Sequence, residues 1–228
     1  MHDVKKVNVM EGILDENDHI AAHVNEKLSK NGILCVNVMG APGAGKTTTL
    51  KNLIRRLDGL VAYVIEGDIE SDIDTQELLG LGIQAYQINT FGACHLDAPM
   101  VESMVDSIDL GRNSILFIEN IGNLVCPAEF SIGEHVKMLV ASVTEGSDKP
   151  YKYPLAFEKA DMIVLNKVDL RPYVDFDEEF FMKGVRALNK DAMVFKTSGK
   201  SGEGFKEAAA WLSWKAGQAC NGNQHHGR

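Results

Sequence analysis

Features that mark several classes of protein are missing from this sequence of 228 residues. No apolar run approaches the ~20 residues that a membrane-spanning helix needs, and the N-terminal residues lack the apolar core of a signal peptide. Cysteines are few and irregularly spaced, so no disulfide framework is expected. Basic residues are outnumbered, and a formal net charge of −9 argues against non-specific nucleic-acid binding. We therefore expect a reduced, cytoplasmic protein with no nucleic-acid and no membrane partner.

The residues that are present follow the pattern of an α/β domain. Apolar residues make up 45% of the chain and charged residues 24%, as in an ordinary soluble protein with a substantial core. Buried strands are predicted at residues 33–39, 61–65, 83–88, 114–118, 136–144, 162–165 and 192–195. Helices are predicted at residues 15–30, 48–56, 75–81, 99–108, 178–188 and 203–215. This alternation predicts a single domain with a mostly parallel β-sheet flanked by helices on both faces.

The chain divides into three segments on this interpretation. Residues 1–31 form an N-terminal helical segment packed on the domain, residues 32–217 form the domain itself, and residues 218–228 form a flexible C-terminal tail. In an open parallel sheet, ligands bind beyond the carboxyl ends of the strands. The nucleotide motifs described next follow such ends, so we expect them to meet at one edge of the sheet.

Residues 40–47, with the sequence GAPGAGKT, indicate the class of ligand. They match the phosphate-binding P-loop, in which Gly40 and Gly45 are separated by four residues and Lys-Thr follows. A glycine-rich turn without a ligand is the alternative, but a strand before the loop and a helix after it disfavour that alternative. Lys46 is expected to reach the β- and γ-phosphates, and the Thr47 hydroxyl to ligate Mg²⁺. The predicted phosphate-binding residues are Gly43, Ala44, Gly45, Lys46, Thr47 and Thr48, and the fold class is that of the P-loop nucleoside triphosphatases.

Residues 166–169, Asn-Lys-Val-Asp, predict that the base is guanine. The carboxylate of Asp169 can accept hydrogen bonds from both N1–H and the N2 amino group of guanine, whereas adenine would leave it unpaired. Lys167 would lie along the base, and Asn166 would tie this loop to the P-loop. Residues 197–200, after the next strand, are suited to the remaining backbone contact with the base, and Ser198 is the residue predicted to bind there. The sequence therefore favours GTP over ATP.

Acidic residues predict the hydrolytic apparatus. Glu119 ends an apolar strand and begins Glu-Asn-Ile-Gly, where many GTPases carry Asp-x-x-Gly, so it is expected to hold a water of the Mg²⁺ shell or to orient the attacking water. Gly122 would let the backbone approach the γ-phosphate. An acidic loop is predicted at residues 66–74, from which either Asp68 or Asp74 assists the ion or the water. The predicted catalytic residues are Lys46, Glu119, Asp74 and Asp68, and the predicted magnesium residues are Thr47, Asp74 and Glu119.

Cys94, His95 and Cys126 offer two thiolates and an imidazole, which suit Zn²⁺ or Ni²⁺ better than Mg²⁺. Three ligands from one chain leave a site short, although two copies related by a two-fold axis could enclose a metal at a dimer interface. From spacing alone, buried or incidental cysteines are the preferred interpretation.

Several segments taken together resemble one family. They are the P-loop at 40–47, Glu-Gly-Asp at 66–68, Cys-His-Leu-Asp-Ala at 94–98, Glu-Asn-Ile-Gly-Asn-Leu at 119–124, Cys-Pro-Ala at 126–128, Thr-Glu-Gly at 144–146 and Asn-Lys-Val-Asp at 166–169. With them the chain resembles the hydrogenase-maturation GTPases that assist nickel insertion, the HypB family of SIMIBI-class P-loop GTPases. The segments that contain the cysteines are more specific than the nucleotide motifs, which many GTPases share.

The resemblance reverses the interpretation of the cysteines. It implies that Cys94, His95 and Cys126 bind nickel or zinc at the interface of a GTP-favoured homodimer. It also implies that Lys152, rather than Lys149, reaches the nucleotide of the partner subunit. The implied activity is slow, Mg²⁺-dependent hydrolysis of GTP to GDP. The implied partners are a nickel-delivering accessory protein and the hydrogenase large subunit precursor.

The sequence departs from some relatives and leaves alternatives open. Residues 1–9 contain no cysteine-rich nickel motif, and His225 and His226 are the only histidines of the terminal residues, so nickel storage is not expected. His19 and His23 are four residues apart on a predicted helix, where a solvated face is favoured over a metal site. The alternatives are a urease-maturation GTPase, a metal-buffering adaptor without significant turnover, and a nucleoside-phosphorylating enzyme.

Overall fold

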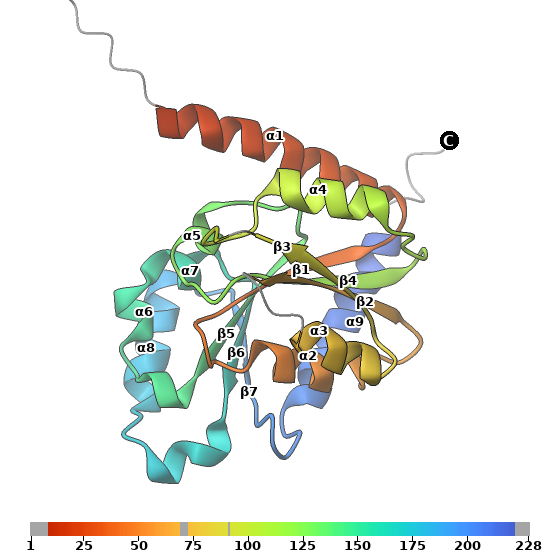
Figure 1. Ribbon diagram of the computed structural model, residues 1–228. Helices are drawn as coiled ribbons and strands as arrows, with labels where there is room; N and C mark the ends of the chain where they lie inside the picture. Colours follow the sequence, from red (N-terminus) through yellow and green to blue (C-terminus); the bar gives the residue numbers. More distant parts are fainter. Residues whose placement is uncertain (1–8, 69–72, 91, 222–228) are drawn as a thin grey trace, which may run out of the picture.

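The computed structural model describes residues 9–68, 73–90 and 92–221. Within these residues one seven-stranded sheet runs in the order β3-β2-β4-β1-β5-β6-β7, and every neighbouring pair is parallel (Figure 1). The predicted class, an α/β fold with helices on both faces, is confirmed. The strands are β1 (Leu34–Met39), β2 (Val61–Asp68), β3 (Gln84–Asn89), β4 (Ser114–Glu119), β5 (Val136–Ser142), β6 (Met162–Asn166) and β7 (Met193–Lys196).

The strands are connected mainly by helices, as parallel pairing requires. The α-helices are α1 (Val9–Lys30), α2 (Lys46–Ile54), α3 (Ile73–Gly80), α4 (Ala98–Ser107), α5 (Cys126–Glu129), α6 (Lys149–Lys152), α7 (Pro154–Lys159), α8 (Glu178–Leu188) and α9 (Phe205–Asn221). Two 3₁₀-helices are η1 (Val143–Glu145) and η2 (Val168–Tyr173). No helix among the described residues is both long and apolar enough to span a bilayer.

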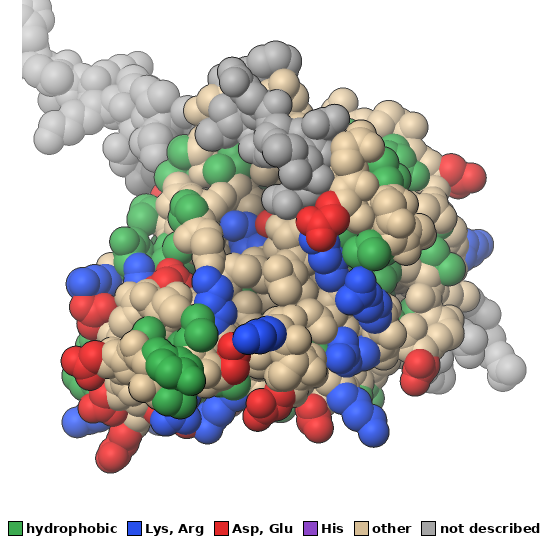
Figure 2. Space-filling model, turned by 60° about the horizontal axis from the view of Figure 1, so that its bottom comes forward, with side chains coloured by type: hydrophobic (Ala, Val, Ile, Leu, Met, Phe, Trp, Pro, Cys, Tyr) green, Lys and Arg blue, Asp and Glu red, His purple; other side chains and the backbone are tan. Residues whose placement is uncertain are grey.

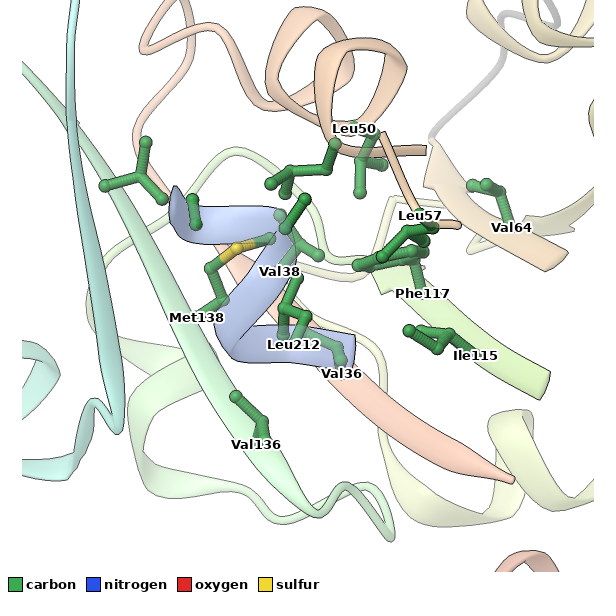
Figure 3. Close-up of a cluster of buried hydrophobic side chains, with 14 of the residues drawn as sticks. Val36, Val38, Leu50, Leu57, Val64, Ile115, Phe117, Val136, Met138 and Leu212 are labelled. Carbon is green, nitrogen blue, oxygen red and sulfur yellow. The ribbon is translucent and has the colours of Figure 1, made fainter. Parts of the chain in front are cut away.

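Alternate residues of the central strands pack on opposite faces of the sheet. Val36 and Val38 of β1 and Phe117 of β4 join a cluster with Leu50 of α2 and Leu212 of α9 (Figure 3). This alternation is the period-2 pattern of a strand, and both sets are apolar because both faces are covered. The sheet is therefore the rigid platform from which the loops at its carboxyl edge project.

The other face is covered in two parts. On the part of this face formed by β2, β4 and β1, a cluster that includes Cys35 and Ile118 packs against α1 and α4. The helices contribute Val24, Leu28 and Val101. On the part formed by β5 and β6, a second cluster packs against α7 and α8. It includes Ile163 and Leu165 of the sheet and Phe157 and Phe181 of the helices. Figure 1 shows α1 lying along α4 on one side of the sheet, away from α2, α3 and α9. The strands that form these two parts of the face lead into different loops at the carboxyl edge of the sheet.

Most predicted elements are present, with shifted ends. Strand β2 continues through Glu66 and Gly67 to Asp68, so the acidic loop predicted at residues 66–74 is wrong at both ends: its first three residues are strand and α3 begins at Ile73. Helix α1 begins at Val9 and α9 continues to Asn221. The sequence did not predict α5, α6, α7 or the 3₁₀-helices. The division into segments 1–31, 32–217 and 218–228 stays a prediction.

Candidate functional site

The P-loop lies between β1 and α2, at the carboxyl edge of the sheet. Gly45 adopts a left-handed conformation, with φ of 95°, immediately before α2 begins at Lys46. A Cβ atom at Gly45 would lie 2.5 Å from Nδ2 of Asn166, so a larger residue would collide with the neighbouring loop. The loop is therefore closely packed against the segment that follows β6. Its backbone amides and the helix N-terminus form the anion-binding arrangement expected for phosphates.

Glu119 faces the P-loop from the end of β4. Its Oε1 atom accepts a hydrogen bond from Thr47 Oγ1 at 3.1 Å and lies 4.0 Å from Lys46 Nζ. The side chains of Glu119 and Lys46 are only about a tenth exposed. Three residues predicted to act on phosphate, Mg²⁺ and water are thus brought together. Two of them are charged and one is a hydroxyl, which is the group expected to ligate Mg²⁺.

The acidic residues predicted beside Glu119 have different outcomes. Glu66 lies beside Glu119 in the parallel register of β2 and β4 and accepts a hydrogen bond from the Thr75 hydroxyl. The side chains of Asp68 and Asp74 lie outside the described residues. The choice between these two aspartates therefore stays as the sequence left it.

Asn166 joins the predicted base-binding loop to the P-loop. Its Nδ2 donates to the Ala44 carbonyl at 3.1 Å, as predicted, and its Oδ1 accepts from Gly199 N at 3.1 Å and Thr197 Oγ1 at 3.3 Å. Asn166 is 2% exposed, so these bonds are shielded from water. Three loops at the edge of the sheet are thereby fixed by one amide group. Sequence reasoning assigned Thr197 and Gly199 to a segment that contacts the base, but it did not predict that they bond to Asn166.

Lys167 and Asp169 follow Asn166 in the predicted base-binding loop. Asp169 accepts a hydrogen bond from the Ser198 hydroxyl through its Oδ1 at 2.6 Å, so the two predicted base contacts are adjacent. Lys167 has a left-handed backbone, with φ of 61°, and its Nζ donates to the Gly43 carbonyl at 2.6 Å. Thr48, the last predicted phosphate residue, is exposed in the first turn of α2. The predicted nucleotide-binding residues of these loops thus surround one site.

Lysine and arginine side chains gather on the same face. Figure 2 shows them across the middle of the face that carries the loops after β6 and β7, although the whole chain has a net charge of −9. Lys152 is 62% exposed and pairs with Asp148 at 2.6 Å, whereas Lys149 is 19% exposed and lies over the ring of Tyr153. Of these two lysines, Lys152 is the one free to extend away from the chain.

Cys94, His95 and Cys126 meet at the surface beside α5. The sulfur atoms of the two cysteines are 3.3 Å apart, and Cys94 Sγ lies 3.3 Å from His95 Nδ1. One ligand atom from each residue lies within 4.8 Å of the others, and no other such cluster of three occurs in the described parts of the chain. Cys94 is exposed, and His95 and Cys126 are partly exposed. The fold brings residues 32 positions apart to one point, which the spacing alone did not indicate, and the binding of a metal there stays a prediction.

The surroundings of His95 and Cys126 favour their uncharged forms. Burial lowers the pKa of His95, whose ring packs on Phe130 with centroids 4.2 Å apart. The hydrogen bond shared with Cys94, followed by burial, raises the pKa of Cys126. A neutral imidazole is the form that binds metal, and a bound divalent cation would displace the thiol protons. Two sulfurs and one nitrogen are a donor set for Zn²⁺ or Ni²⁺.

The paired histidines of α1 do not form a second metal site. His23 Nδ1 lies 2.7 Å from Glu102 of α4, and His19 is exposed on the same helix. This agrees with the predicted solvated helix face. His225 and His226 lie outside the described residues.

The fold and this edge of the sheet define a P-loop nucleotide-binding protein. The family model for the CobW/HypB/UreG nucleotide-binding domain matches residues 34–196. The HypB hydrogenase maturation factor of Escherichia coli K12 is 43% identical over 209 residues, which cover 91% of this chain and 71% of that protein. The chain belongs to the HypB family of hydrogenase maturation factors.

Two further relatives bear on the metal and on the client enzyme. A crystal structure of HypB from Helicobacter pylori in complex with nickel has a TM-score of 0.85 and 34% identity, and the match covers 89% of this chain and 96% of that one. The hydrogenase/urease maturation factor HypB of Helicobacter hepaticus is 35% identical over 226 residues, which cover 97% of this chain and 92% of that protein. The resemblance predicted from the motifs is thus confirmed at the level of the family.

Proposed function

We propose that this protein is a GTPase metallochaperone that assists nickel insertion during hydrogenase maturation. GTP with Mg²⁺ occupies the P-loop and the Asn166–Asp169 loop, and hydrolysis to GDP is slow. The observation that carries the proposal is the position of Cys126, which follows the Glu119–Gly122 segment on the same stretch of chain. A change at the γ-phosphate can therefore reach the metal ligands through only a few residues.

Slow turnover follows from what the motifs supply. The P-loop offers Lys46, and Glu119 offers a carboxylate to orient Mg²⁺ or water. An arginine finger contributes about 10³–10⁵ in rate in other GTPases, and none of the nucleotide motifs of this chain contains an arginine. The protein then acts as a timed switch, since a long-lived GTP state keeps one conformation available for metal transfer.

The metal site is completed by a second copy of the chain. Cys94, His95 and Cys126 supply three donors, whereas closed Zn²⁺ sites have four, and the exposed position of Cys94 leaves the cluster open to a partner. In a two-fold dimer the same residues of both subunits would enclose Ni²⁺ or Zn²⁺. Lys152 would reach the partner's nucleotide, because its ion pair with exposed Asp148 is weak enough to exchange.

The proposed partners are a nickel-delivering accessory protein and the hydrogenase large subunit precursor, and the proposed location is the cytoplasm. The name of the Helicobacter hepaticus relative supports a second candidate, service to urease as well. The two are distinguished by which apoenzyme the purified, nickel-loaded protein activates in the presence of GTP.

The test of the proposal is a Ni²⁺ titration of the whole protein, once with GDP and once with a non-hydrolysable GTP analogue, with mass followed by light scattering. The expected result is a dimer with the analogue and tighter nickel binding in that state. A GTP turnover assay on the same preparation excludes the adaptor alternative if hydrolysis is measurable. A monomer in both states, with nickel affinity independent of the nucleotide, would contradict the switch.

A further inference from the structure

Three asparagine side chains hold the loop that carries Cys94 and His95. Asn123 Nδ2 donates to the Cys94 carbonyl at 3.3 Å, and Asn120 Oδ1 accepts from Leu96 N at 3.0 Å. These two bonds lie on either side of His95. Farther along, Asn17 Oδ1 accepts from Ala98 N at 2.9 Å. Two contacts therefore come from the segment after Glu119, and one comes from α1.

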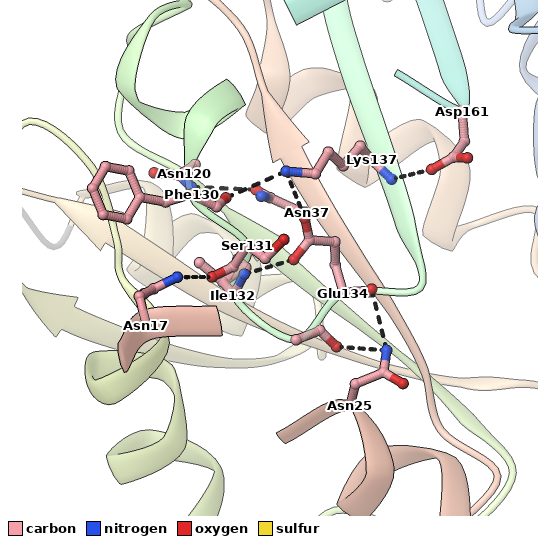
Figure 4. Close-up of polar contacts among 11 residues, drawn as sticks. Asn17, Asn25, Asn37, Asn120, Phe130, Ser131, Ile132, Glu134, Lys137 and Asp161 are labelled. Atoms are coloured by element: carbon pink, nitrogen blue, oxygen red, sulfur yellow. Dashed lines mark hydrogen bonds and ion pairs between the residues drawn. The ribbon is translucent and has the colours of Figure 1, made fainter. Parts of the chain in front are cut away.

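The segment after Glu119 is also fixed to the nucleotide side. Asn120 N donates to the Val38 carbonyl at 3.0 Å, and Asn120 Nδ2 donates to Asn37 Oδ1 at 3.2 Å, a bond drawn in Figure 4. Both acceptors belong to β1, which leads into the P-loop. Asn120 is 1% exposed, so water cannot readily replace its partners.

Asn123 makes the second connection. Its backbone pairs with that of Gly40, the first residue of the P-loop, in an isolated antiparallel bridge. A Cβ atom at Gly122 would lie 2.9 Å from Pro42 Cγ, so the segment runs against the P-loop itself. Asn123 Oδ1 also accepts a hydrogen bond at 2.9 Å from the backbone N–H of Val125, which is the residue before Cys126. One side chain thus bonds to the backbone next to both cysteines.

We propose that Asn120 and Asn123 are the positioning residues that transmit the nucleotide state to the metal ligands. Both side-chain amides form hydrogen bonds with the loop that carries Cys94 and His95. A shift of the Glu119–Gly122 segment toward a γ-phosphate therefore moves the backbone on both sides of His95. Asn123 moves the backbone before Cys126 at the same time. The three ligands then change their separation together, and nickel affinity follows the nucleotide.

This inference rests on the proposed coupling between GTP and metal, and a matched set of variants tests it. The variants are Asn120→Ala and Asn123→Ala, with Asn17→Ala as the control. Asn17 is also a buried asparagine that accepts a hydrogen bond from the loop that carries Cys94 and His95. It belongs to α1, however, and its side chain bonds to Ala98 and Ser131 rather than to the P-loop or β1. The measurement is the Ni²⁺ affinity of the whole protein with GDP and with a non-hydrolysable GTP analogue, after a thermal melt establishes folding.

The ratio of the two affinities is the informative quantity. Allosteric coupling is typically about 5–150-fold, and we expect Asn120→Ala and Asn123→Ala to reduce the ratio to within about twofold of one. Asn17→Ala should weaken nickel binding equally in both states and keep the wild-type ratio. Asn123 is only partly buried, so its variant decides the question if Asn120→Ala does not fold.

Failure of this inference is distinguishable from failure of the proposed function. If the wild-type ratio is one, the coupling itself is absent and both proposals fall. A wild-type ratio that survives in folded Asn123→Ala overturns only the assignment of the asparagines. If Asn17→Ala also brings the ratio of the two nickel affinities to one, the assignment of Asn120 and Asn123 is overturned too. Any loosening of the loop would then be sufficient to abolish the coupling.

Discussion

The two halves of the sheet's carboxyl edge are organised differently. At the β5–β6–β7 half, Asn166, Thr197 and Ser198 are at most 2% exposed, and buried hydrogen bonds join Thr197 to Asn166 and Asn166 to the P-loop. At the β2–β4 half, Cys94 is exposed, and the proposed metal ligands are held through hydrogen bonds to the loop backbone. One half is a preorganised site for a small molecule, and the other is an open surface.

This difference suggests a division of labour. A buried network of hydrogen bonds keeps one geometry and therefore reads a fixed base at little cost in reorganisation. A ligand cluster supported by a few loop contacts can change its shape when a neighbouring segment moves. The P-loop lies between the halves, so a nucleotide bound there touches both. Variants in each half should separate the two behaviours.

The largest effect is expected in the middle of the edge, at Lys46. Lys46→Ala removes the charge that neutralises the β- and γ-phosphates, and GTP turnover should fall by at least about 10²–10³-fold. The matched control is Lys51→Ala, one turn farther along α2, where the lysine pairs with Glu77. Steady-state phosphate release measures both. Unchanged turnover in Lys46→Ala would show that the P-loop is not the active site.

The next effect is confined to the open half. Cys126→Ala removes a thiolate ligand, and nickel affinity should fall by more than about a hundredfold, since even outer-shell partners cost about 10–100-fold. GTP affinity should change little, because its groups lie on other loops. His19→Ala tests the histidine pair of α1 and should leave both affinities unchanged. Nickel affinity should also decrease as the pH falls, because protons compete for sulfur.

A smaller effect is expected in the buried half. Asp169→Asn leaves one acceptor where guanine presents two donors, so the preference for GTP over ATP should shrink by about 1–3 kcal/mol. Competition between the two nucleotides measures this preference, and Asp175→Asn, on the exposed chain beyond η2, is the control. Equal competition by ATP in the wild type would refute the assignment of the base.

The sequence predicted the buried half in more detail than the open half, for a physical reason. The P-loop and Asn166–Asp169 are local patterns, and each follows directly from a strand whose end is readable from its apolar run. The sequence predicted that Asn166 ties its loop to the P-loop, and the bond to the Ala44 carbonyl makes this connection across the end of β5, which lies between β1 and β6. The sequence also pointed to the segment that contains Thr197 and Gly199, but not to their hydrogen bonds with Asn166, which complete the network.

The metal half depends on the meeting of two distant segments. Cys94 lies in the loop after β3 and Cys126 begins α5 after β4, and their spacing in the sequence does not predict the 3.3 Å between their sulfur atoms. Only the family resemblance pointed to them. Asn120 and Asn123 lay within a recognised motif, but their roles depend on which backbone groups come close. Glu66 was predicted to begin a loop, whereas it belongs to β2 and accepts a hydrogen bond from the Thr75 hydroxyl inside the fold.

The smallest effect concerns the scaffold beneath the open half, which includes α1. His135 Nδ1 accepts a hydrogen bond from Cys35 N at 3.0 Å, and its Nε2 lies 2.8 Å from the Ser29 hydroxyl, so a neutral ring joins β5, β1 and α1. Burial lowers the pKa of His135 below its usual 6.5. The unfolded chain therefore takes up the proton first, and the stability that the neutral ring provides is lost as the pH falls below about 6.5.

His135→Asn removes this titration and keeps an acceptor near the position of Nδ1. At pH 7.5 the variant should lose about 1 kcal/mol, since Asn cannot reach Ser29. Between pH 7.5 and pH 5.5 its urea midpoint should fall less than that of the wild type, whereas the exposed control His19→Asn should follow the wild type. An unchanged pH dependence in His135→Asn would mean that the imidazole does not link α1 to the sheet. If the slope does flatten, His135 is an acid-sensitive contact between α1 and β1, the strand that leads into the P-loop.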